Sequence, residues 1–202
     1  KIFKGKIHEP DTINFIISHC QKGDVVHAGT FFGDFLPPIS KALEKNAKLW
    51  AFEPNYENYL CSKITVLINS LDNVKLHNAG VGNTNSSHKM LIKNDKGKYL
   101  GGGSRIIQNP EKEGTINVQT VCLDNLIPEE REVSIIQLDV EGYEKEALEG
   151  ALKIIYRCKP ILILEDNKNI ISGRWFQEKI ISMGYEIISH VHFNTILEYN
   201  KG

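Results

Sequence analysis

The sequence predicts an α/β protein built on a mainly parallel sheet that is covered by helices on both faces. Three observations support this fold class. Short apolar runs of strand length recur along the chain, helical patterns separate most of them, and each run is apolar at most of its positions. Strands that alternate with helices form parallel sheets, and strands buried on both faces carry such continuous apolar runs. The 202 residues suit one domain over residues 1–202.

The first half of the chain is expected to contribute three parallel strands. They cover Asp24–Ala28, Leu49–Phe52 and Val74–His77. Gly29 and Gly33 end the first strand, and a helix over Phe35–Lys45 follows, with its prolines confined to the first turn, where proline is tolerated. The apolar spacing after the second strand predicts another helix over Tyr56–Leu71.

The second half of the chain is expected to contribute four more strands, which makes a seven-stranded mixed sheet. They cover Ile135–Asp139, Ile161–Leu164, Tyr185–His190 and Thr195–Tyr199. Helical patterns follow the first two, over a stretch that includes Ala147 to Ile155 and over Trp175–Met183. No helical pattern separates the last two strands, so they are expected to be antiparallel. Residues 84–120 fit neither pattern and are read as an inserted β-hairpin or flap.

The residues at the ends of the first two strands predict a nucleoside-containing cofactor. In open parallel sheets the ligand lies beyond the carboxyl ends of the strands. Gly29 and Gly33 allow a tight turn and a close approach to a ligand. Glu53 follows Gly33 by 20 residues, the separation at which an acid at the second strand accepts hydrogen bonds from ribose hydroxyls.

The loop after the first strand favours S-adenosylmethionine over a nicotinamide dinucleotide. The dinucleotide fingerprint is GxGxxG, whereas this loop reads Gly29-Thr30-Phe31-Phe32-Gly33 and lacks the middle glycine that admits a pyrophosphate. The two phenylalanines would crowd a diphosphate but would form a wall for an adenosyl or methionyl group.

Four motifs, in order, resemble the FkbM family of S-adenosylmethionine-dependent methyltransferases. They are GDVVHAGTFFGDF (Gly23–Phe35), WAFEPNYEN (Trp50–Asn58), LDVEGYEKEALEGA (Leu138–Ala151) and ILILED (Ile161–Asp166). HEP (His8–Pro10), before the first strand, is also similar to the family. The resemblance covers nearly the whole chain and is weakest over residues 84–115 and at the end of the chain.

The resemblance implies a Rossmann-like class I methyltransferase fold and a set of cofactor-binding residues. That set is His27, Gly29, Thr30, Gly33, Phe35, Glu53, Pro54, Asn78 and Asp139. One position departs from the family, because its first strand usually ends in an Asp and this chain has His27. A neutral histidine accepts one hydrogen bond but supplies no charge to pair with the cofactor's ammonium group. The sequence leaves open how this histidine affects cofactor affinity and whether its role is purely structural.

The ends of the fourth and fifth strands are the expected site of chemistry. Methyl transfer needs an aligned acceptor and a base for its proton, and Asp139 and Glu165 are the candidate catalytic residues. An alternative is similar to the Mg²⁺ site of catechol-type O-methyltransferases, with Asp139, Asp166 and Asn167 as ligands. The FkbM resemblance requires no metal, and none is included in the expected site.

The expected function is O-methylation of a hydroxyl on a sugar, glycan or polyketide-like small molecule. Two alternatives are a catalytically silent binding module with the same fold and, less favoured, a nicotinamide-dependent oxidoreductase. Lys plus Arg number 24 and Asp plus Glu 25, a balance that argues against a dedicated nucleic-acid binder. No membrane helix, signal peptide or paired cysteine motif is apparent, so a cytoplasmic protein with no membrane partner is expected; the oligomeric state is not predicted.

Overall fold

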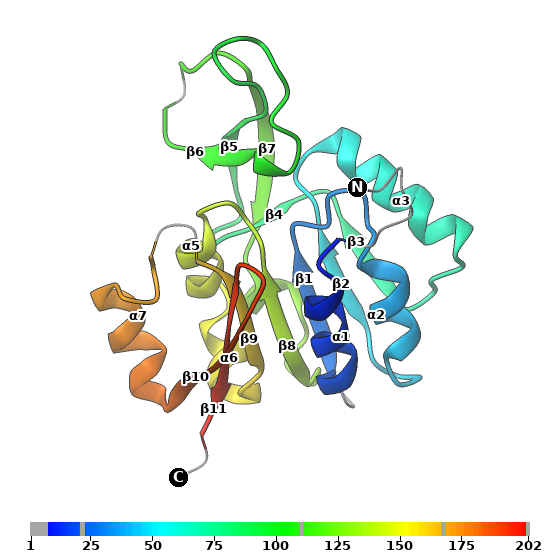
Figure 1. Cartoon of the computed structure of the whole chain (residues 1–202), viewed down its shortest axis with the longest axis vertical. Helices are drawn as coiled ribbons and strands as arrows, with labels where there is room; N and C mark the ends of the chain where they lie inside the picture. The colour runs from blue at the N-terminus through cyan, green and yellow to red at the C-terminus, as the bar shows by residue number, and fades with distance from the viewer. Residues whose placement is uncertain (1–7, 21–22, 110, 167–168, 201–202) are drawn as a thin grey trace.

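The computed structural model describes residues 8–20, 23–109, 111–166 and 169–200, and it confirms the predicted fold class. The main sheet consists of β1 (Asp24–Ala28), β2 (Leu49–Phe52), β3 (Val74–His77), β8 (Val133–Leu138), β9 (Ile161–Glu165), β10 (Tyr185–Val191) and β11 (Asn194–Tyr199). The strand order is β10-β11-β9-β8-β1-β2-β3, as the ribbon shows (Figure 1). β3, β2, β1, β8 and β9 are parallel, whereas β11 is antiparallel to both of its neighbours.

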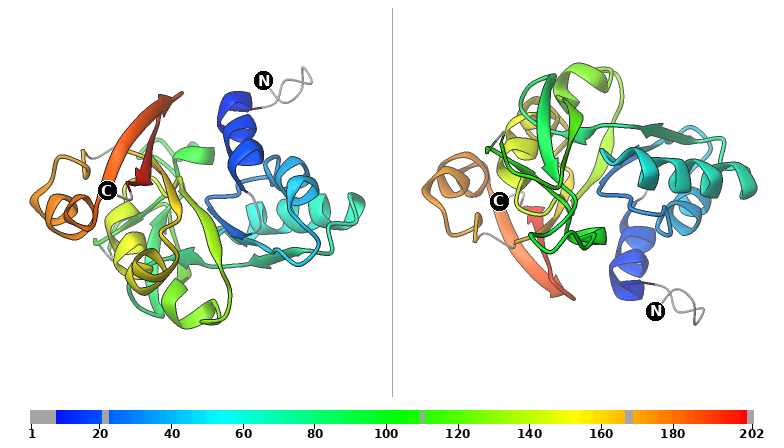
Figure 2. Two further views of the ribbon diagram at one scale, coloured as in Figure 1. Left: turned by 90° about the horizontal axis from the view of Figure 1, so that it is seen from below. Right: turned by 90° about the horizontal axis from the view of Figure 1, so that it is seen from above.

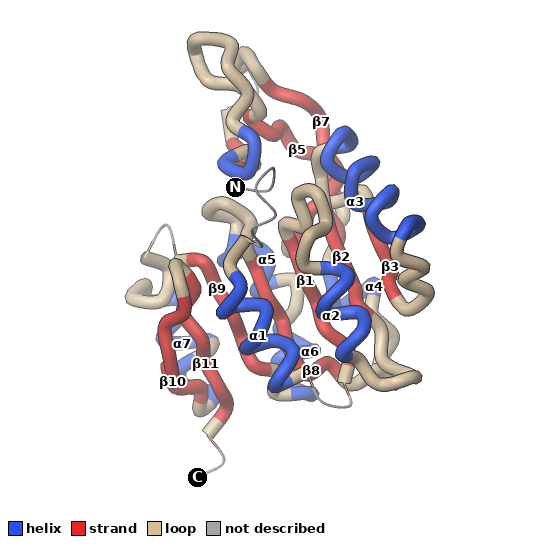
Figure 3. Tube along the Cα trace, turned by 45° about the vertical axis from the view of Figure 1, so that its right-hand side comes forward, coloured by secondary structure: helices blue, strands red, loops and turns tan. Residues whose placement is uncertain are grey.

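Helices cover both faces of this sheet because the central strands are apolar on both sides. One face carries α1 (Pro10–His19), α2 (Leu36–Ala42) and α3 (Tyr56–Ile68), and the other carries α4 (Leu123–Leu126), α5 (Glu144–Glu149), α6 (Leu152–Cys158) and α7 (Arg174–Lys179), followed by the short η3 (Ile181–Met183). In β1, Val25 packs toward the first group of helices and Val26 toward the second. Figure 3 shows α1 and α2 in front of the sheet, and the end-on views show α1 and α4 on opposite sides of it (Figure 2). No described helix is long and apolar enough to cross a membrane.

The helical pattern after β8 is interrupted, and two short helices replace the single expected one. The interruption lies at Gly150, whose carbonyl accepts a hydrogen bond from the Asp124 backbone N–H at 2.9 Å. The Asp124 carboxylate in turn accepts from the N–H groups of Lys153 and Ile154, at 2.9 and 3.0 Å. A tertiary contact with α4 therefore supplies the cap that begins α6, which periodicity along one segment does not reveal.

The inserted segment forms a second sheet rather than an isolated hairpin. It contains β4 (Gly80–Val81), β5 (Ser86–Leu91), β6 (Arg105–Ile107) and β7 (Thr115–Val121), in the order β4-β7-β5-β6, with the short η2 (Gly101–Gly103) before β6. β5 and β7 pair as an antiparallel hairpin, and β6 and β4 extend it on either side. Figure 1 shows this sheet standing above the main sheet, and we call residues 80–121 the flap.

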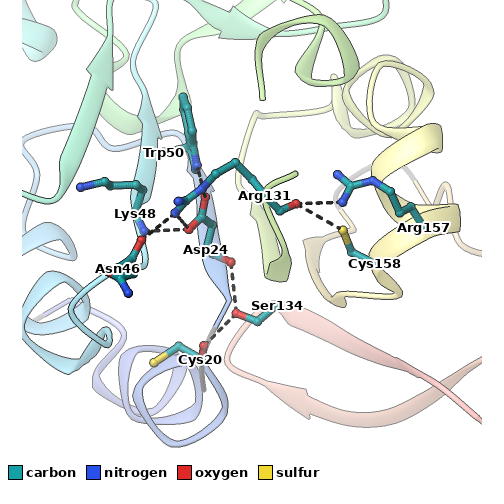
Figure 4. A network of polar contacts seen from close by, with 9 residues as sticks. All are labelled: Cys20, Asp24, Asn46, Lys48, Trp50, Arg131, Ser134, Arg157 and Cys158. Carbon is teal, nitrogen blue, oxygen red and sulfur yellow. Dashed lines mark hydrogen bonds and ion pairs between the residues drawn. The ribbon is translucent and has the colours of Figure 1, made fainter. Parts of the chain in front are cut away.

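A buried ion pair joins the elements at the amino ends of the central strands, away from the flap. Asp24 begins β1 and is 1% exposed. Its carboxylate accepts from the Lys48 backbone N–H at 2.8 Å, from the Trp50 indole at 2.7 Å and from Arg131 Nε at 2.8 Å. Figure 4 shows how these contacts connect β1 and β2 to the segment before β8. Because every carboxylate oxygen is hydrogen-bonded, the buried charge is compensated, and it fixes this end of the sheet.

Candidate active site

A cavity of about 740 Å³ lies at the carboxyl ends of the central strands, between the main sheet and the flap. The ends of β1, β2, β8 and β9 form its floor, and flap residues that include Met90 and Gly101–Ile106 also line it. The volume is within the range of small-molecule sites. Its position is the one that parallel α/β sheets use for ligands.

The turn after β1 brings backbone close to the cavity. Gly29 has a φ of +92°, and a Cβ built on it would lie 2.0 Å from the carbonyl oxygen of Asp139. Only glycine fits where the β1 turn meets the end of β8. Phe31 has a φ of +49° although it carries a side chain, and its ring lines the cavity. Phe32 is 40% exposed and does not line the cavity, so Phe31 alone supplies the apolar wall expected from this pair.

Glu53 follows β2 and is held by the backbone on both sides. Its Oε2 accepts from the Phe31 N–H at 2.9 Å, and its Oε1 accepts from the Asn55 N–H at 2.9 Å. The side chain is 4% exposed and lines the cavity. Burial raises the pKa of Glu53 to about 7, despite hydrogen bonds from Asn55, Phe31 and Asn58 that lower it. These three hydrogen bonds leave the carboxylate room to accept a further one from a hydroxyl donor in the cavity.

His27 is the next-to-last residue of β1 and lies beside Gln137 of β8, its partner in the parallel register. His27 Nδ1 is hydrogen-bonded to Gln137 Oε1, and the imidazole ring stacks on Phe35 with centroids 5.0 Å apart. Burial lowers the pKa of His27 to about 4, so the ring is neutral at physiological pH. A neutral ring that donates from Nδ1 presents Nε2 as an acceptor. Nε2 is buried and has no hydrogen-bond partner among the described residues, and the residue lines the cavity.

Three carboxyl groups meet beyond β8 and β9. Asp139, Glu141 and Glu165 each place an oxygen within 4.8 Å of the others. Burial raises the pKa of Asp139 well above its usual range, and a hydrogen bond with Glu165 and the charges of Glu165 and Glu141 raise it further. Burial and the hydrogen bond with Glu165 thus both favour the protonated form of Asp139. The parallel pairing of β8 with β9 creates this arrangement because it aligns the two strand ends.

Two members of the alternative metal set, Asp139 and Asp166, lie in the part of the chain that the structure describes. Asp166 Oδ1 accepts from the Ile170 N–H at 2.6 Å and so caps the following turn. Asn167 lies outside the described residues. The carboxyl groups that do come together are Asp139, Glu141 and Glu165, and their mutual repulsion contributes to the raised pKa of Asp139.

Most of the expected cofactor-binding residues line the cavity, and two do not. Those that line it are His27, Gly29, Thr30, Phe35, Glu53, Pro54 and Asp139. Gly33 lies behind the turn, where its φ is +81° and an added Cβ would be 3.1 Å from the Ser62 Cα. Asn78 is exposed, and its Nδ2 donates to the carbonyls of Glu53 and Pro54 at 2.9 and 3.2 Å. Both positions support the turns that carry the cavity residues.

Several cavity residues were not among those expected from the sequence. Gln137, Asn58 and Tyr143 line the cavity, and Gln137 and Asn58 also form hydrogen bonds with His27 and Glu53. A signal did exist for Gln137, because it is the one polar residue inside the apolar run Ile135–Leu138.

A protein-family comparison places the chain beside known methyltransferases. The family model described as the methyltransferase FkbM domain matches residues 27–199. Comparison with curated protein sequences gives no match.

Solved structures with a similar fold are also methyltransferases by their names. A methyltransferase FkbM from Methylobacillus flagellatus superposes with a TM-score of 0.62 at 16% identity, over 88% of this chain and 44% of that chain. This chain therefore spans less than half of that protein's length. An rRNA methylase from Streptococcus thermophilus gives a TM-score of 0.55 at 13% identity, over 96% and 98% of the two chains. A methyltransferase from Streptococcus mutans, solved with S-adenosylhomocysteine, gives 0.54 at 11% identity, over 95% and 97%.

Proposed function

The chain belongs to the methyltransferase FkbM domain family, and from this premise we propose that it methylates a hydroxyl oxygen of a sugar, glycan or polyketide-like small molecule. Family membership bears out the expected cofactor, S-adenosylmethionine. The observation that carries the proposal is that Glu53 and the Asp139–Glu165 pair line the same cavity. One end of that cavity thus offers acceptors for ribose hydroxyls and the other offers a base.

The residues of the cavity suit this cofactor. The Glu53 oxygens would hold the ribose, Phe31 would pack on an apolar part of the molecule, and the unpartnered Nε2 of His27 would accept a hydrogen bond from its ammonium group. The close approach at Gly29 leaves backbone rather than side chain at the floor. The cofactor supplies an electrophilic methyl group on a sulfonium, which needs no activation by the protein.

Of Asp139 and Glu165, we assign the removal of the acceptor's proton to Glu165. Burial and the hydrogen bond with Glu165 raise the pKa of Asp139, so a protonated Asp139 would donate to Glu165. Glu165 would accept the proton of the acceptor hydroxyl while the hydroxyl oxygen bonds to the methyl carbon. The bond between that carbon and the sulfonium sulfur would break, and S-adenosylhomocysteine would be the leaving group. Asp139 would orient Glu165 and be a positioning residue. A small acceptor is favoured because the flap closes one side of the cavity, and the near-neutral charge does not favour nucleic acid.

Labelled cofactor and a panel of hydroxylated acceptors test the proposal. We expect label transfer to at least one sugar or polyketide-like hydroxyl, and Glu165→Gln should lower turnover about 10²–10⁴-fold with cofactor affinity unchanged. Glu146→Gln, on a partly exposed carboxylate of α5 outside the cavity, is the matched control and should keep native turnover. Native turnover in Glu165→Gln would refute the role of this residue, and label on nitrogen or carbon would refute O-methylation.

A further inference from the structure

The outward side of α3 is apolar, which is unusual for a surface helix. The exposed large apolar side chains are Tyr56 (59% exposed), Leu60 (38%), Ile64 (57%), Leu67 (67%) and Ile68 (75%). The one fully buried side chain of this helix is a serine, Ser62. We call these five residues the α3 stripe. Amphipathic helices normally place such residues against the core and polar ones outside, so this pattern is reversed.

The α3 stripe is too large to be scattered surface apolarity. Its five side chains together expose roughly 500 Å², at about 150–200 Å² for a fully exposed large apolar side chain. Contiguous apolar patches on monomers reach about 300–600 Å² and are often functional. A specific interface buries about 800 Å² on each partner. The stripe can therefore provide more than half of one side of an interface, and the polar residues around it would supply the rest.

The spacing of the stripe makes it complementary to itself. Tyr56, Leu60, Ile64 and Ile68 follow one another at intervals of four and form one ridge along the helix. This ridge is symmetric about position 62, so a two-fold axis there would set Leu60 against Ile64 of a second copy. Ridges of this kind pack into each other's grooves at a crossing angle of about −50°. A two-fold contact of one patch with itself is the commonest arrangement in soluble oligomers.

The chemistry around the stripe favours a second copy over other partners. The charged residues of α3 are Glu57 and Lys63, both exposed, so the helix carries no excess of positive charge for nucleic acid or anionic lipid. α3 packs beside β3, which ends the strand order of the main sheet, and Figure 1 shows it at that side of the molecule. Lys75 is exposed on β3 and opposes strand-to-strand pairing there. The helix is thus the available contact.

We propose that the chain forms a two-fold symmetric homodimer in which the α3 stripes of two copies pack against each other. Leu60 and Ile64 lie at the centre of that contact. The interface is separate from the active-site cavity, because none of the five stripe residues lines it. The dimer proposal therefore does not depend on the identity of the acceptor or on the catalytic roles assigned above.

Sedimentation equilibrium of the full chain, from low-micromolar to submillimolar concentration, tests the proposal. The native chain should dimerise, and Ile64→Glu should weaken the dimer by at least about 100-fold, because it buries a carboxylate opposite an apolar partner. Tyr156→Glu is the matched control: Tyr156 is 70% exposed on α6, on the other face of the sheet, and this variant should dimerise like the native chain. Circular dichroism and melting temperature should be unchanged in both variants.

Cross-linking adds a second, local measurement. Cys61 is a free, exposed cysteine next to Leu60, so a short bis-maleimide should link two native copies through it, and Cys61→Ser or Ile64→Glu should abolish the link. A native chain that stays monomeric over the whole range would overturn the proposal. So would a dimer that persists in Ile64→Glu, or a monomer that instead binds neutral phosphatidylcholine vesicles through the stripe.

Discussion

Glu53→Ala is the sharpest test of where the cofactor lies. In the native protein the carboxylate accepts hydrogen bonds from the N–H groups of Phe31 and Asn55, each at 2.9 Å, and the residue lines the cavity. Hydrogen bonds to a charged group contribute about 1.5–3 kcal/mol, so the loss of the ribose contacts should weaken cofactor binding roughly 10- to 150-fold. Glu57→Ala, an exposed acid in the next turn, is the matched control and should bind normally.

The raised pKa of Glu53 predicts that cofactor affinity depends on pH. Its pKa is about 7, and the ionised form is the better acceptor for hydroxyl donors. Affinity should therefore fall as the pH drops through 7, by up to roughly tenfold between about pH 8 and about pH 6, and binding near pH 7 should release about half a proton. Isothermal titration calorimetry with S-adenosylmethionine and S-adenosylhomocysteine, in buffers of different ionisation enthalpy, measures both quantities. Unchanged affinity in Glu53→Ala would refute this placement, as would a native affinity that ignores pH.

Two further substitutions separate binding from stability. His27→Asp should tighten cofactor binding by about 1 kcal/mol, or roughly fivefold. The new carboxylate beside the Gln137 amide pairs with the ammonium group of the cofactor, and this gain exceeds the cost of desolvating the carboxylate. Weaker binding at an unchanged melting temperature would show that the neutral imidazole has its own role. Asp24→Ala should lower the free energy of unfolding by about 2–4 kcal/mol in urea titrations, because it leaves the Arg131 and Trp50 donors unpaired, with cofactor affinity unchanged. Glu132→Ala, which removes an exposed ion pair at 3.9 Å, is the control and should cost less than about 1 kcal/mol.

The strand positions could be predicted because each central strand carries its own signal. The run Asp24–Ala28 is apolar and is broken by Gly29, and the structure reproduces its bounds. Leu49–Phe52 and Val74–His77 agree equally well. Burial on both faces keeps β1 and β2 mainly apolar whatever their neighbours are, whereas the edge strand β3 is only partly buried and carries the exposed Lys75. Gly29 and Glu53 could also be predicted from the sequence. The backbone geometry of the first turn requires a glycine, and binding of ribose hydroxyls requires an acid after the second strand.

Contacts between distant segments were decided only by the tertiary structure. The hairpin expected over residues 84–120 became a four-stranded sheet because β4 and β6 add to it from outside the two main strands, and their local signals are weak. The tautomer of His27 depends on Gln137, 110 positions away, and becomes visible only once β1 and β8 are paired.

The sequence by itself determined which residues stand at the strand ends: Gly29, Glu53, Asp139 and Glu165 each follow an apolar run whose length and composition are local properties. The ionisation states of those residues belong to the fold. The pKa of Asp139 is raised because burial and the nearby carboxylates oppose its charge, and the pKa of Glu53 is raised to about 7 because burial removes its carboxylate from water. Desolvation and charge repulsion depend on what lies within a few ångströms in space, and a linear chain does not specify that until the sheet has formed.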